Sequence, residues 1–423
     1  MELTGLSFRD YKAFPGRHSI EVRPLTILIG RNSSGKSAIA RLPLLLGASL
    51  SERAQAPLEL SGDGFDLGGS LLDVIHDRKP HGNVDVGATF RDESGREQEL
   101  SATVQFYADL SLQVITELRA RTQWRDVKLV RVSEAPDADP GVYRLYLDEK
   151  LEVAEEEVSF TGLLPIRYSD SDAAMRMAEA LDDLAPSLQD IVYLGPFREA
   201  PQRSYRFPGG FPQNVGRSGA TAPALLAADA RRHGGAVVEA VAEWYREHLG
   251  GWLLDVDLDA NGTTFSLVLR KPEEPSVGIN VVDAGTGLSQ VLPVIAQRLF
   301  EQVTGSQGSL EIVEHPELHL HPGAHGSLAD LYIDALQVPG TRFILETHSE
   351  NFLLRIRRRV AERKLAPEQV RIYWVDDSQG NGSRIVPIDV LPDGEVSTWP
   401  KGVFSEDFDE LKAIRAAQRR AGA

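Results

Sequence analysis

The sequence predicts an α/β fold in which a mostly parallel sheet is flanked by helices and an antiparallel β subdomain is added. The first observation is LTILIGRNSSGKSAIA, residues 25–40, where an apolar run leads through a glycine-rich turn into an apolar helix start. The second is the alternation of strand and helix patterns between residues 289 and 360, which is typical of parallel sheets. The third is residues 83–160, where short alternating strands are separated by turn signals such as DESG and DADPG.

The individual elements follow from local patterns in chain order. Apolar and β-branched runs or alternation predict strands at 3–8, 18–29, 190–196, 309–314 and 342–346. Amphipathic spacing predicts helices at 36–50, 171–186, 222–249 (one long helix or two), 289–303, 324–336 and 350–360. Residues 51–70 form a Gly/Ser/Asp-containing link. LLDVDLDANGTTFSLVLR predicts a hairpin that turns at Asn261-Gly262.

Composition excludes several classes of protein. The 423 residues carry a net charge of -17, which disfavours a broad non-specific grip on nucleic acid, although a local basic patch remains compatible with it. The absence of cysteine excludes disulfides, cysteine zinc sites and thiol catalysis. The N-terminus lacks a signal-peptide core and no apolar run could span a bilayer, so we expect a cytoplasmic protein without membrane contact.

Residues 30–37 match the phosphate-binding pattern G-x-x-x-x-G-K-[ST] at every fixed position. Gly30 and Gly35 let successive N–H groups turn toward phosphate oxygens, and the following helix adds its positive N-terminal end. Lys36 would bridge the β- and γ-phosphates of ATP, and Ser37 would hold Mg²⁺. Because a strand precedes the loop and a helix follows it, a chance Gly/Ser turn is the weaker interpretation. The residues expected at the nucleotide are Gly30, Arg31, Asn32, Ser33, Ser34, Gly35, Lys36, Ser37 and Ala38.

Two later strand ends carry candidate catalytic and metal-binding side chains. In SLEIVEHPELHLHP, Glu314 would emerge at the carboxyl end of a buried strand, where ligands bind in open α/β sheets, and could hold Mg²⁺. In TRFILETHSENF, His348 could reach a γ-phosphate or its attacking water. Taken singly, a strand-end Glu without a role and a satisfied surface His are the simpler interpretations.

The stretch VVDAGTGLSQVLPVIAQRL is a second helix start that could favour an anion. It places Gly285, Gly287 and Ser289 before an apolar helix. The alternative is a simple glycine turn with a serine N-cap. Because the stretch has no lysine, it does not make a complete nucleotide site by itself.

Together these motifs resemble a known family. The phosphate loop, the Gly-x-Gly-x-Ser-Gln signature at 285–290, the PELHLHP strand end and THSENF are similar to the ABC-type, AAA-family predicted ATPases. Relatives include chromosome-maintenance ATPases, double-strand-break repair ATPases and overcoming-lysogenisation-defect nucleases. FDLGGSLLDVIH (65–76), YLGPFREAPQRSY (193–205) and GEVSTWPKGVFSEDFDELKAI (394–414) look like one bacterial subgroup that ends in a small domain of unknown function.

The resemblance implies a homodimer that holds two ATP molecules between its protomers. Residues 30–37 of one protomer would bind ATP, while Gly285, Gly287, Ser289 and Gln290 of the other would cap the γ-phosphate, in an isologous arrangement. The implied parts are a P-loop NTPase core of ABC type at 1–56, a β-rich and helical insertion at 57–189, a second core part with signature, Walker B and switch His at 190–350, and a C-terminal region at 351–423.

The Walker B strand departs from the family pattern. This strand usually ends in Asp-Glu, where Asp serves the metal and Glu polarises the attacking water. Here the pair is Glu314-His315. Glu314 can still hold the metal together with Ser37, but the missing second acid predicts slow hydrolysis. Glu317 and His348 are the candidate substitutes.

Two clusters allow two interpretations each. Four histidines fall close together, at His315, His319, His321 and His325. Spacings of four suit zinc ligands on a helix, but Pro316 and Pro322 interrupt any helix, and the resemblance makes this loop face the partner protomer. The basic stretch RIRRRVAERK, 355–364, is either a solvated helix or a nucleic-acid contact.

The sequence therefore predicts an ATP- and Mg²⁺-dependent ATPase that dimerises and switches a protein partner, such as a nuclease or toxin-like effector in bacterial defence or DNA-related processes. The alternatives are a nucleic-acid-processing enzyme, a non-hydrolysing nucleotide-gated scaffold and, less favoured, a transporter subunit. VDDSQG, 375–380, has paired acids but no preceding Glu-Gly strand end to support a nuclease. The apolar tail residues Trp399, Val403, Phe404 and Phe408 predict that the tail packs on the core.

Overall fold

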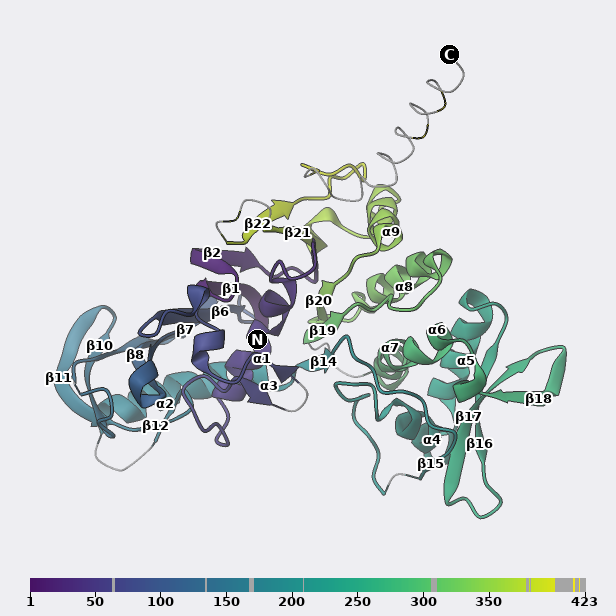
Figure 1. The fold of residues 1–423 in the computed structure, drawn as a ribbon, viewed down its shortest axis with the longest axis horizontal. Helices are drawn as coiled ribbons and strands as arrows, with labels where there is room; N and C mark the ends of the chain where they lie inside the picture. Colours follow the sequence, from purple (N-terminus) through teal and green to yellow (C-terminus); the bar gives the residue numbers. More distant parts are fainter. Residues whose placement is uncertain are drawn as a thin grey trace.

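The computed structural model describes residues 1–62, 65–133, 135–166, 171–207, 209–305, 310–377, 380, 382–399, 414 and 418. Figure 1 shows a central region flanked by two lobes. The central region contains a six-stranded sheet, the left lobe most of an eight-stranded antiparallel sheet, and the right lobe a four-stranded sheet with helices. The mixed α/β content and the added antiparallel β structure confirm the predicted fold class at this level.

The central sheet has the strand order β14-β19-β20-β3-β21-β22. Its strands are β14 (Val192–Leu194), β19 (Leu310–Glu314), β20 (Arg342–Glu346), β3 (Leu25–Gly30), β21 (Val370–Asp376) and β22 (Arg384–Ile388). Neighbours from β14 to β21 pair in parallel, and β22 pairs antiparallel with β21. The carboxyl ends of β3, β19 and β20 therefore meet at one edge of the sheet, where the three candidate motifs begin.

Strand β3 is buried along its whole length because both faces of the central sheet are covered. Leu28 belongs to a core shared with helix α1 (Lys36–Ser49) and the antiparallel sheet. Ile27 and Ile29 belong to a second core on the other side. Helices of the second core include α7 (Leu292–Thr304), α8 (Pro322–Ala335) and α9 (Glu350–Ala361). The period of two along β3 thus divides its side chains between two layers.

The antiparallel sheet has the order β11-β10-β9-β8-β7-β6-β1-β2. Its strands are β1 (Glu2–Tyr11), β2 (Phe14–Glu21), β6 (Asn83–Arg91), β7 (Glu97–Tyr107), β8 (Leu112–Arg121), β9 (Asp126–Arg131), β10 (Gly141–Leu147) and β11 (Lys150–Val158). β1 pairs directly with β6, so this sheet includes residues from both 1–56 and 57–189. Nearby lie α2 (Asp172–Leu184), α3 (Pro186–Gln189) and the short strand pairs β4 (Ser61–Gly62) with β5 (Phe65–Asp66) and β12 (Phe160–Thr161) with β13 (Leu164–Pro165).

The right lobe contains the predicted hairpin. Its strands are β15 (Tyr205–Arg206), β16 (Leu253–Leu258), β17 (Thr264–Lys271) and β18 (Glu274–Asn280), and its helices include α4 (Ala222–Arg232), α5 (Ala236–His248) and α6 (Thr286–Gln290). β16 pairs with β17 across a turn in which Gly262 has φ +63°, which confirms the Asn-Gly turn. The range 222–249 forms two helices, separated at Gly234 and Gly235, both at φ +80°. Strand β18 was not expected.

The prediction of one strand at 18–29 is wrong. The range contributes to β2 in the antiparallel sheet and to β3 in the central sheet, with Pro24 between them, which has no N–H to donate to a ladder. Strands β21 and β22 were also unexpected. Of the tail residues, Trp399 lies near Arg357, whereas Val403, Phe404 and Phe408 lie outside the described residues. In the described part of the chain, no helix is long and apolar enough to cross a membrane.

Candidate functional site

The phosphate-binding loop connects β3 to α1 and requires glycine at two positions. Gly30 has φ +150°, and a Cβ atom there would lie 2.2 Å from the carbonyl oxygen of Val375. Gly35 has φ +101°, and its Cβ would lie 2.7 Å from the ring of Phe14. Residues of β21 and β2 therefore press on the loop from outside and allow only glycine without rearrangement. This is the cradle that backbone N–H groups need in order to approach an anion closely.

The two polar side chains at the end of the loop are held by the loop itself and by Glu346. Lys36 is 3% exposed, and its Nζ donates to the carbonyl oxygens of Gly30 (3.1 Å) and Arg31 (2.7 Å). The same Nζ lies 3.6 Å from Glu346 Oε1. The Ser37 hydroxyl donates to Glu346 Oε2 at 2.7 Å. Burial lowers the pKa of Lys36, and the Glu346 carboxylate opposes this shift.

A cavity of about 520 Å³ opens over the loop and could contain a nucleotide. Its lining includes Asn32, Ser33, Gly35, Lys36, Ser37, Ala38, Arg41, His315 and Glu346. Within the loop, the fully buried Ser34 hydroxyl has no hydrogen-bond partner among the described residues. The glycine cradle and this unsatisfied donor fit a bound phosphate, so the residues present suit the nucleotide that the loop pattern predicts.

Glu314 ends β19 as predicted, but its carboxylate is fully engaged. Arg41 of α1 donates to both oxygens, from Nε to Oε1 at 2.6 Å and from Nη2 to Oε2 at 2.8 Å. The hydroxyl of Tyr193, in β14, donates to Oε1 at 2.8 Å. Arg198 donates to the backbone oxygens of Glu314 and His315, both at 3.0 Å. Glu314 is 1% exposed, so its negative charge is compensated inside the protein.

Glu346 is a site residue that the sequence reasoning missed. It ends β20 directly opposite Glu314 in the parallel register, so the two carboxylates leave the sheet at the same level. Burial raises the pKa of Glu346, against the hydrogen bond from Ser37, and the charge of Glu314 adds to the rise. The rule that drew attention to Glu314, an acid at the carboxyl end of a buried strand, applies equally to the sequence FILE before Thr347.

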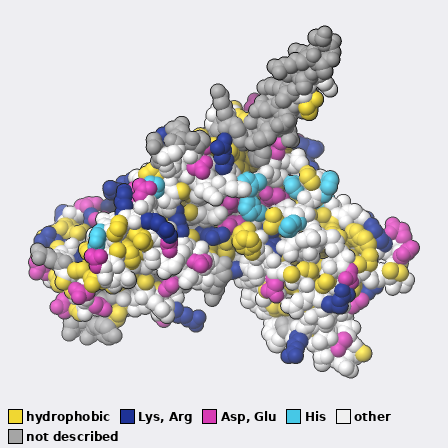
Figure 2. Space-filling model, viewed as in Figure 1, with side chains coloured by type: hydrophobic (Ala, Val, Ile, Leu, Met, Phe, Trp, Pro, Cys, Tyr) yellow, Lys and Arg dark blue, Asp and Glu magenta, His cyan; other side chains and the backbone are white. Residues whose placement is uncertain are grey.

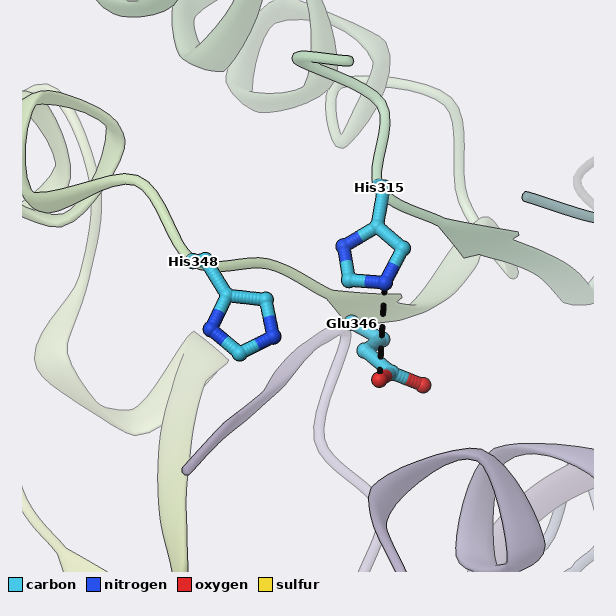
Figure 3. Close-up of side chains that lie close together, drawn as sticks. All are labelled: His315, Glu346 and His348. Atoms are coloured by element: carbon cyan, nitrogen blue, oxygen red, sulfur yellow. Dashed lines mark ion pairs between the residues drawn. The ribbon is translucent and has the colours of Figure 1, made fainter. Parts of the chain in front are cut away.

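His315 and His348 flank Glu346 (Figure 3). Their rings stack with centroids 5.1 Å apart, and His315 Nε2 lies 3.7 Å from Glu346 Oε1. In the described residues, these three side chains form the group of potential metal ligands, with ligand atoms within 4.8 Å of one another. Burial and the charges of Lys36 and His315 lower the pKa of His348 to about 4, so its ring is neutral at physiological pH.

Glu317 orients the backbone that carries His348. Its Oε1 accepts the His348 backbone N–H at 2.9 Å, while its buried Oε2 has no partner among the described residues. The structure thus brings Ser37, His315, His348 and Glu317 to one edge of the sheet. The carboxylate that the Ser37 hydroxyl contacts there is that of Glu346.

The signature residues lie away from the phosphate loop. Figure 1 shows α6 in the right lobe, apart from α1. Ser289 lies inside this helix, where its hydroxyl donates to the Thr286 oxygen at 3.0 Å, so it is not an N-cap; Gly285 occupies that position. A Cβ on Gly287 would lie 2.4 Å from the His319 oxygen, which means that the signature packs against the PELHLHP loop. Gln290 Nε2 donates to the Glu199 oxygen at 3.5 Å.

Two other histidines of the cluster, His321 and His325, have structural contacts. His321 caps α8 by accepting the Gly323 N–H at 3.1 Å. His325 contacts the Ser349 hydroxyl at 2.7 Å and the Leu320 oxygen at 3.1 Å. Cyan histidine side chains gather over the region of β20, β19 and α8 in the space-filling view (Figure 2). These contacts do not favour a zinc site made of the four clustered histidines.

The basic stretch forms most of α9, and acids neutralise much of its charge. Ion pairs join Arg355 and Arg359 to Asp330, Arg358 and Arg359 to Glu362, and Arg357 to Glu395. Guanidinium groups already paired with carboxylates are less available to phosphates. The described contacts therefore favour the solvated, salt-bridged helix over a nucleic-acid contact.

Comparisons with known proteins show which solved structures have a similar fold. No protein-family model matches the chain, and no curated protein matches it. The chain is similar to the SMC head bound to the C-winged helix domain of ScpA, with a TM-score of 0.50, 12% identity, and coverage of 92% of this chain and 98% of that chain. At this identity the likeness concerns the fold alone.

Two further solved structures match at lower TM-scores and add no argument. One is the SMC head domain from Thermotoga maritima (TM-score 0.42, 13% identity, covering 92% of this chain and 100% of that chain). The other is an Smc head domain with an extended coiled coil, bound to the C-terminal domain of ScpA derived from Pyrococcus furiosus (0.46, 11%, 98% and 99%). The narrower bacterial subgroup stays a prediction, and the fold is similar to that of an SMC head.

Proposed function

We propose that the chain binds Mg-ATP at the phosphate loop, closes as a homodimer around two nucleotides, and hydrolyses ATP slowly to switch a protein partner. The observation that carries the proposal is the loop between β3 and α1, where two conformationally required glycines precede a buried Lys36 and Ser37. The ABC-type fold supports it, since this fold places a nucleotide at the same kind of loop.

The chain's own residues would act as follows. The loop from Gly30 to Gly35 would enclose the β-phosphate with its N–H groups, and Ser34 could donate its unsatisfied hydroxyl. Lys36 would exchange its present carbonyl contacts for the phosphate oxygens. When bound, Mg²⁺ would neutralise charge on the phosphates and orient them. His348 would offer a neutral ring nitrogen toward the γ-phosphate.

Slow hydrolysis follows from the residues around the attacking water. His315 stands at the position of the usual second acid, and Glu317 uses one carboxylate oxygen to hold the His348 backbone. A positioned general base is worth about 10²–10⁴-fold in rate. ATP would therefore act mainly by holding two protomers together. A scaffold that binds ATP without hydrolysing it would be the extreme case.

The dimer is proposed because the signature has no phosphate loop beside it in its own chain. The cavity over the loop is lined by the turn between β1 and β2, the loop itself, α1, and His315 and Glu346 at the strand ends, whereas α6 lies in the right lobe. A second copy related by a two-fold axis would bring Ser289 to the first copy's nucleotide. The solved SMC head has ScpA bound. We infer by analogy that this chain also switches a protein partner, such as a nuclease or toxin-like effector.

Nucleotide binding to a Lys36→Ala variant tests the function. Isothermal titration calorimetry with a slowly hydrolysed ATP analogue and Mg²⁺ should show at least about a tenfold loss of affinity, because the variant removes a charge-assisted contact to phosphate. The matched control is Lys128→Ala, whose ammonium pairs with Glu117 in the antiparallel sheet and should not affect binding. Equal affinities for Lys36→Ala and the wild type would refute the assignment.

A further inference from the structure

Two acids leave the central sheet side by side, and only one of them faces the phosphate loop. Glu314 and Glu346 are register partners at the ends of β19 and β20. We propose that Glu346, and not Glu314, is the carboxylate that holds Mg²⁺ together with Ser37. This proposal rests on the proposed nucleotide binding at the same loop. It assigns the metal-binding acid to β20, the strand next to β3, instead of β19.

Glu314 is unsuited to the metal because its oxygens are already used. The Arg41 guanidinium donates to both of them, and the Tyr193 hydroxyl donates a third hydrogen bond. Burial lowers the pKa of the Arg41 guanidinium, but the hydrogen bond and charge of Glu314 outweigh it and raise this pKa. A metal at Glu314 would have to displace a bidentate ion pair in a site that is 1% exposed.

Glu346 has the geometry that Glu314 lacks. In phosphate-loop ATPases the metal is shared by the loop hydroxyl and a strand-end carboxylate. The Ser37 hydroxyl oxygen and Glu346 Oε2 are 2.7 Å apart. Two adjacent ligands of an octahedral Mg²⁺ at 2.0–2.1 Å are separated by about 2.9 Å. A shift of a few tenths of an ångström would therefore place both oxygens in one coordination sphere.

The charges around Glu346 couple the metal to the nucleotide. Without a ligand, Lys36 lies 3.6 Å from the Glu346 carboxylate and compensates its charge. When Lys36 turns to a phosphate, this buried carboxylate is left beside a second anion. A divalent cation between them removes the repulsion. Glu346 should therefore weaken binding of metal-free ATP and strengthen binding of Mg-ATP.

The neighbouring histidines suggest a competing metal. His315, Glu346 and His348 could together select a transition metal such as Zn²⁺, for which imidazole is a preferred ligand. The contact between Glu346 and Ser37 favours the proposed Mg²⁺ site instead, because zinc sites use nitrogen, sulfur or carboxylate ligands rather than a serine hydroxyl. The proposed Mg²⁺ would bind together with the nucleotide, whereas Zn²⁺ at the histidines would bind without it.

The test measures affinity for a slowly hydrolysed ATP analogue in excess Mg²⁺ and in EDTA. The variants are Glu346→Gln, which keeps the size and an acceptor for Ser37, and Glu314→Gln as the matched change on the adjacent strand. Mg²⁺ should raise the wild-type affinity by about tenfold or more and that of Glu346→Gln by less than about threefold. In EDTA, Glu346→Gln should bind more tightly than the wild type. Glu314→Gln should keep the metal dependence.

Fold and metal controls complete the experiment. Thermal melting checks each variant, and Glu346→Asp, which keeps the charge and shortens the reach to Ser37, provides the comparison if Glu346→Gln does not fold. Its metal dependence should fall between those of the wild type and Glu346→Gln. Electron paramagnetic resonance of Mn²⁺ with the nucleotide analogue gives a direct readout, which should show less bound Mn²⁺ in Glu346→Gln.

Three outcomes would overturn the proposal. Loss of metal dependence in Glu314→Gln, with Glu346→Gln unaffected, would return the metal to Glu314 and leave the nucleotide site intact. Tight binding of Zn²⁺ without nucleotide, abolished by His315→Ala and His348→Ala, would replace the Mg²⁺ site by a zinc site. No nucleotide binding by the wild type in either buffer would refute both this inference and the proposed function.

Discussion

Two carboxylates of the same type, Glu314 and Glu346, have different surroundings. Arg41 and Tyr193 occupy the first, whereas a lysine and a serine of the phosphate loop face the second. A glutamate with both oxygens in a bidentate pair is a structural anchor. A glutamate that only accepts a hydrogen bond from a loop serine can bind a cation once the serine hydroxyl turns to another acceptor.

The depressed pKa of His348 predicts a pH effect on the stability of the nucleotide-free protein. In the folded state the pKa is about 4, below the ordinary value of 6.5, so the unfolded chain binds more protons in this window. Stability should therefore fall as the pH falls from about 6.5 toward 4. Urea unfolding at pH 7 and pH 5 should show a smaller loss for His348→Gln than for the wild type. Parallel losses in the two proteins would mean that His348 titrates as an ordinary histidine.

The turn from β3 into α1 depends on contacts from other elements. Positive φ angles at Gly30 and Gly35 give the loop its curvature, while Val375 and Phe14 limit the space outside it. Because these contacts come from β21 and β2, the loop conformation is held by both large sheets. This supports an anion site that exists before the nucleotide arrives, which reduces the entropic cost of binding.

Substitution of Gly35 by alanine should measure how strictly the loop requires glycine beside Phe14. The change forces a left-handed backbone on alanine, at about 1–2 kcal/mol, and pushes a methyl group against Phe14, at about 1–3 kcal/mol more. Gly95→Ala is the matched control, since Gly95 has φ +82° and no atom within 4 Å of the added Cβ. Urea unfolding should show the larger loss for Gly35→Ala. Equal losses would mean that Phe14 moves aside without cost.

At the scale of the whole molecule, the chain separates the phosphate loop from the proposed signature. The phosphate loop lies in the central region and the signature helix α6 lies in the right lobe (Figure 1). The PELHLHP loop links them, since Gly287 packs against the His319 backbone. A nucleotide bound in the central region could therefore act on the right lobe through this loop or through a second protomer.

Replacing Ser289 by arginine should separate nucleotide binding from dimerisation. Light scattering with the slowly hydrolysed ATP analogue should show a doubling of mass for the wild type. The variant should remain monomeric, because a long cation at α6 would prevent close approach of the partner's nucleotide. Its affinity for the analogue as a monomer should be unchanged, and Ser94→Arg, at the exposed tip between β6 and β7, should dimerise normally. A wild type that stays monomeric with saturating analogue would contradict the dimer.

Local sequence patterns were sufficient for many of the elements and for the phosphate loop. The loop spacing, the Asn-Gly hairpin, and the buried strands before Glu314 and Thr347 depend on neighbours within a few residues, so short-range chemistry specifies them. The break at Pro24 was equally local, and the apolar run that continues beyond it concealed the change of sheet. Strand β21, VRIYWVD, carries an ordinary strand pattern that the sequence reasoning missed. Strands β18 and β22 have a weaker pattern, and their stability depends on pairing with β17 and β21.

The choice between the two acids was decided only by the tertiary structure. Sequence reasoning selected Glu314 from its motif, but the partner of each carboxylate comes from a distant part of the chain. Arg41 is 273 residues from Glu314, and Ser37 is 309 residues from Glu346. Ion pairing and burial depend on which side chains the sheet order places together. Here β20 lies between β3 and β19, so it is Glu346 that stands next to the phosphate loop.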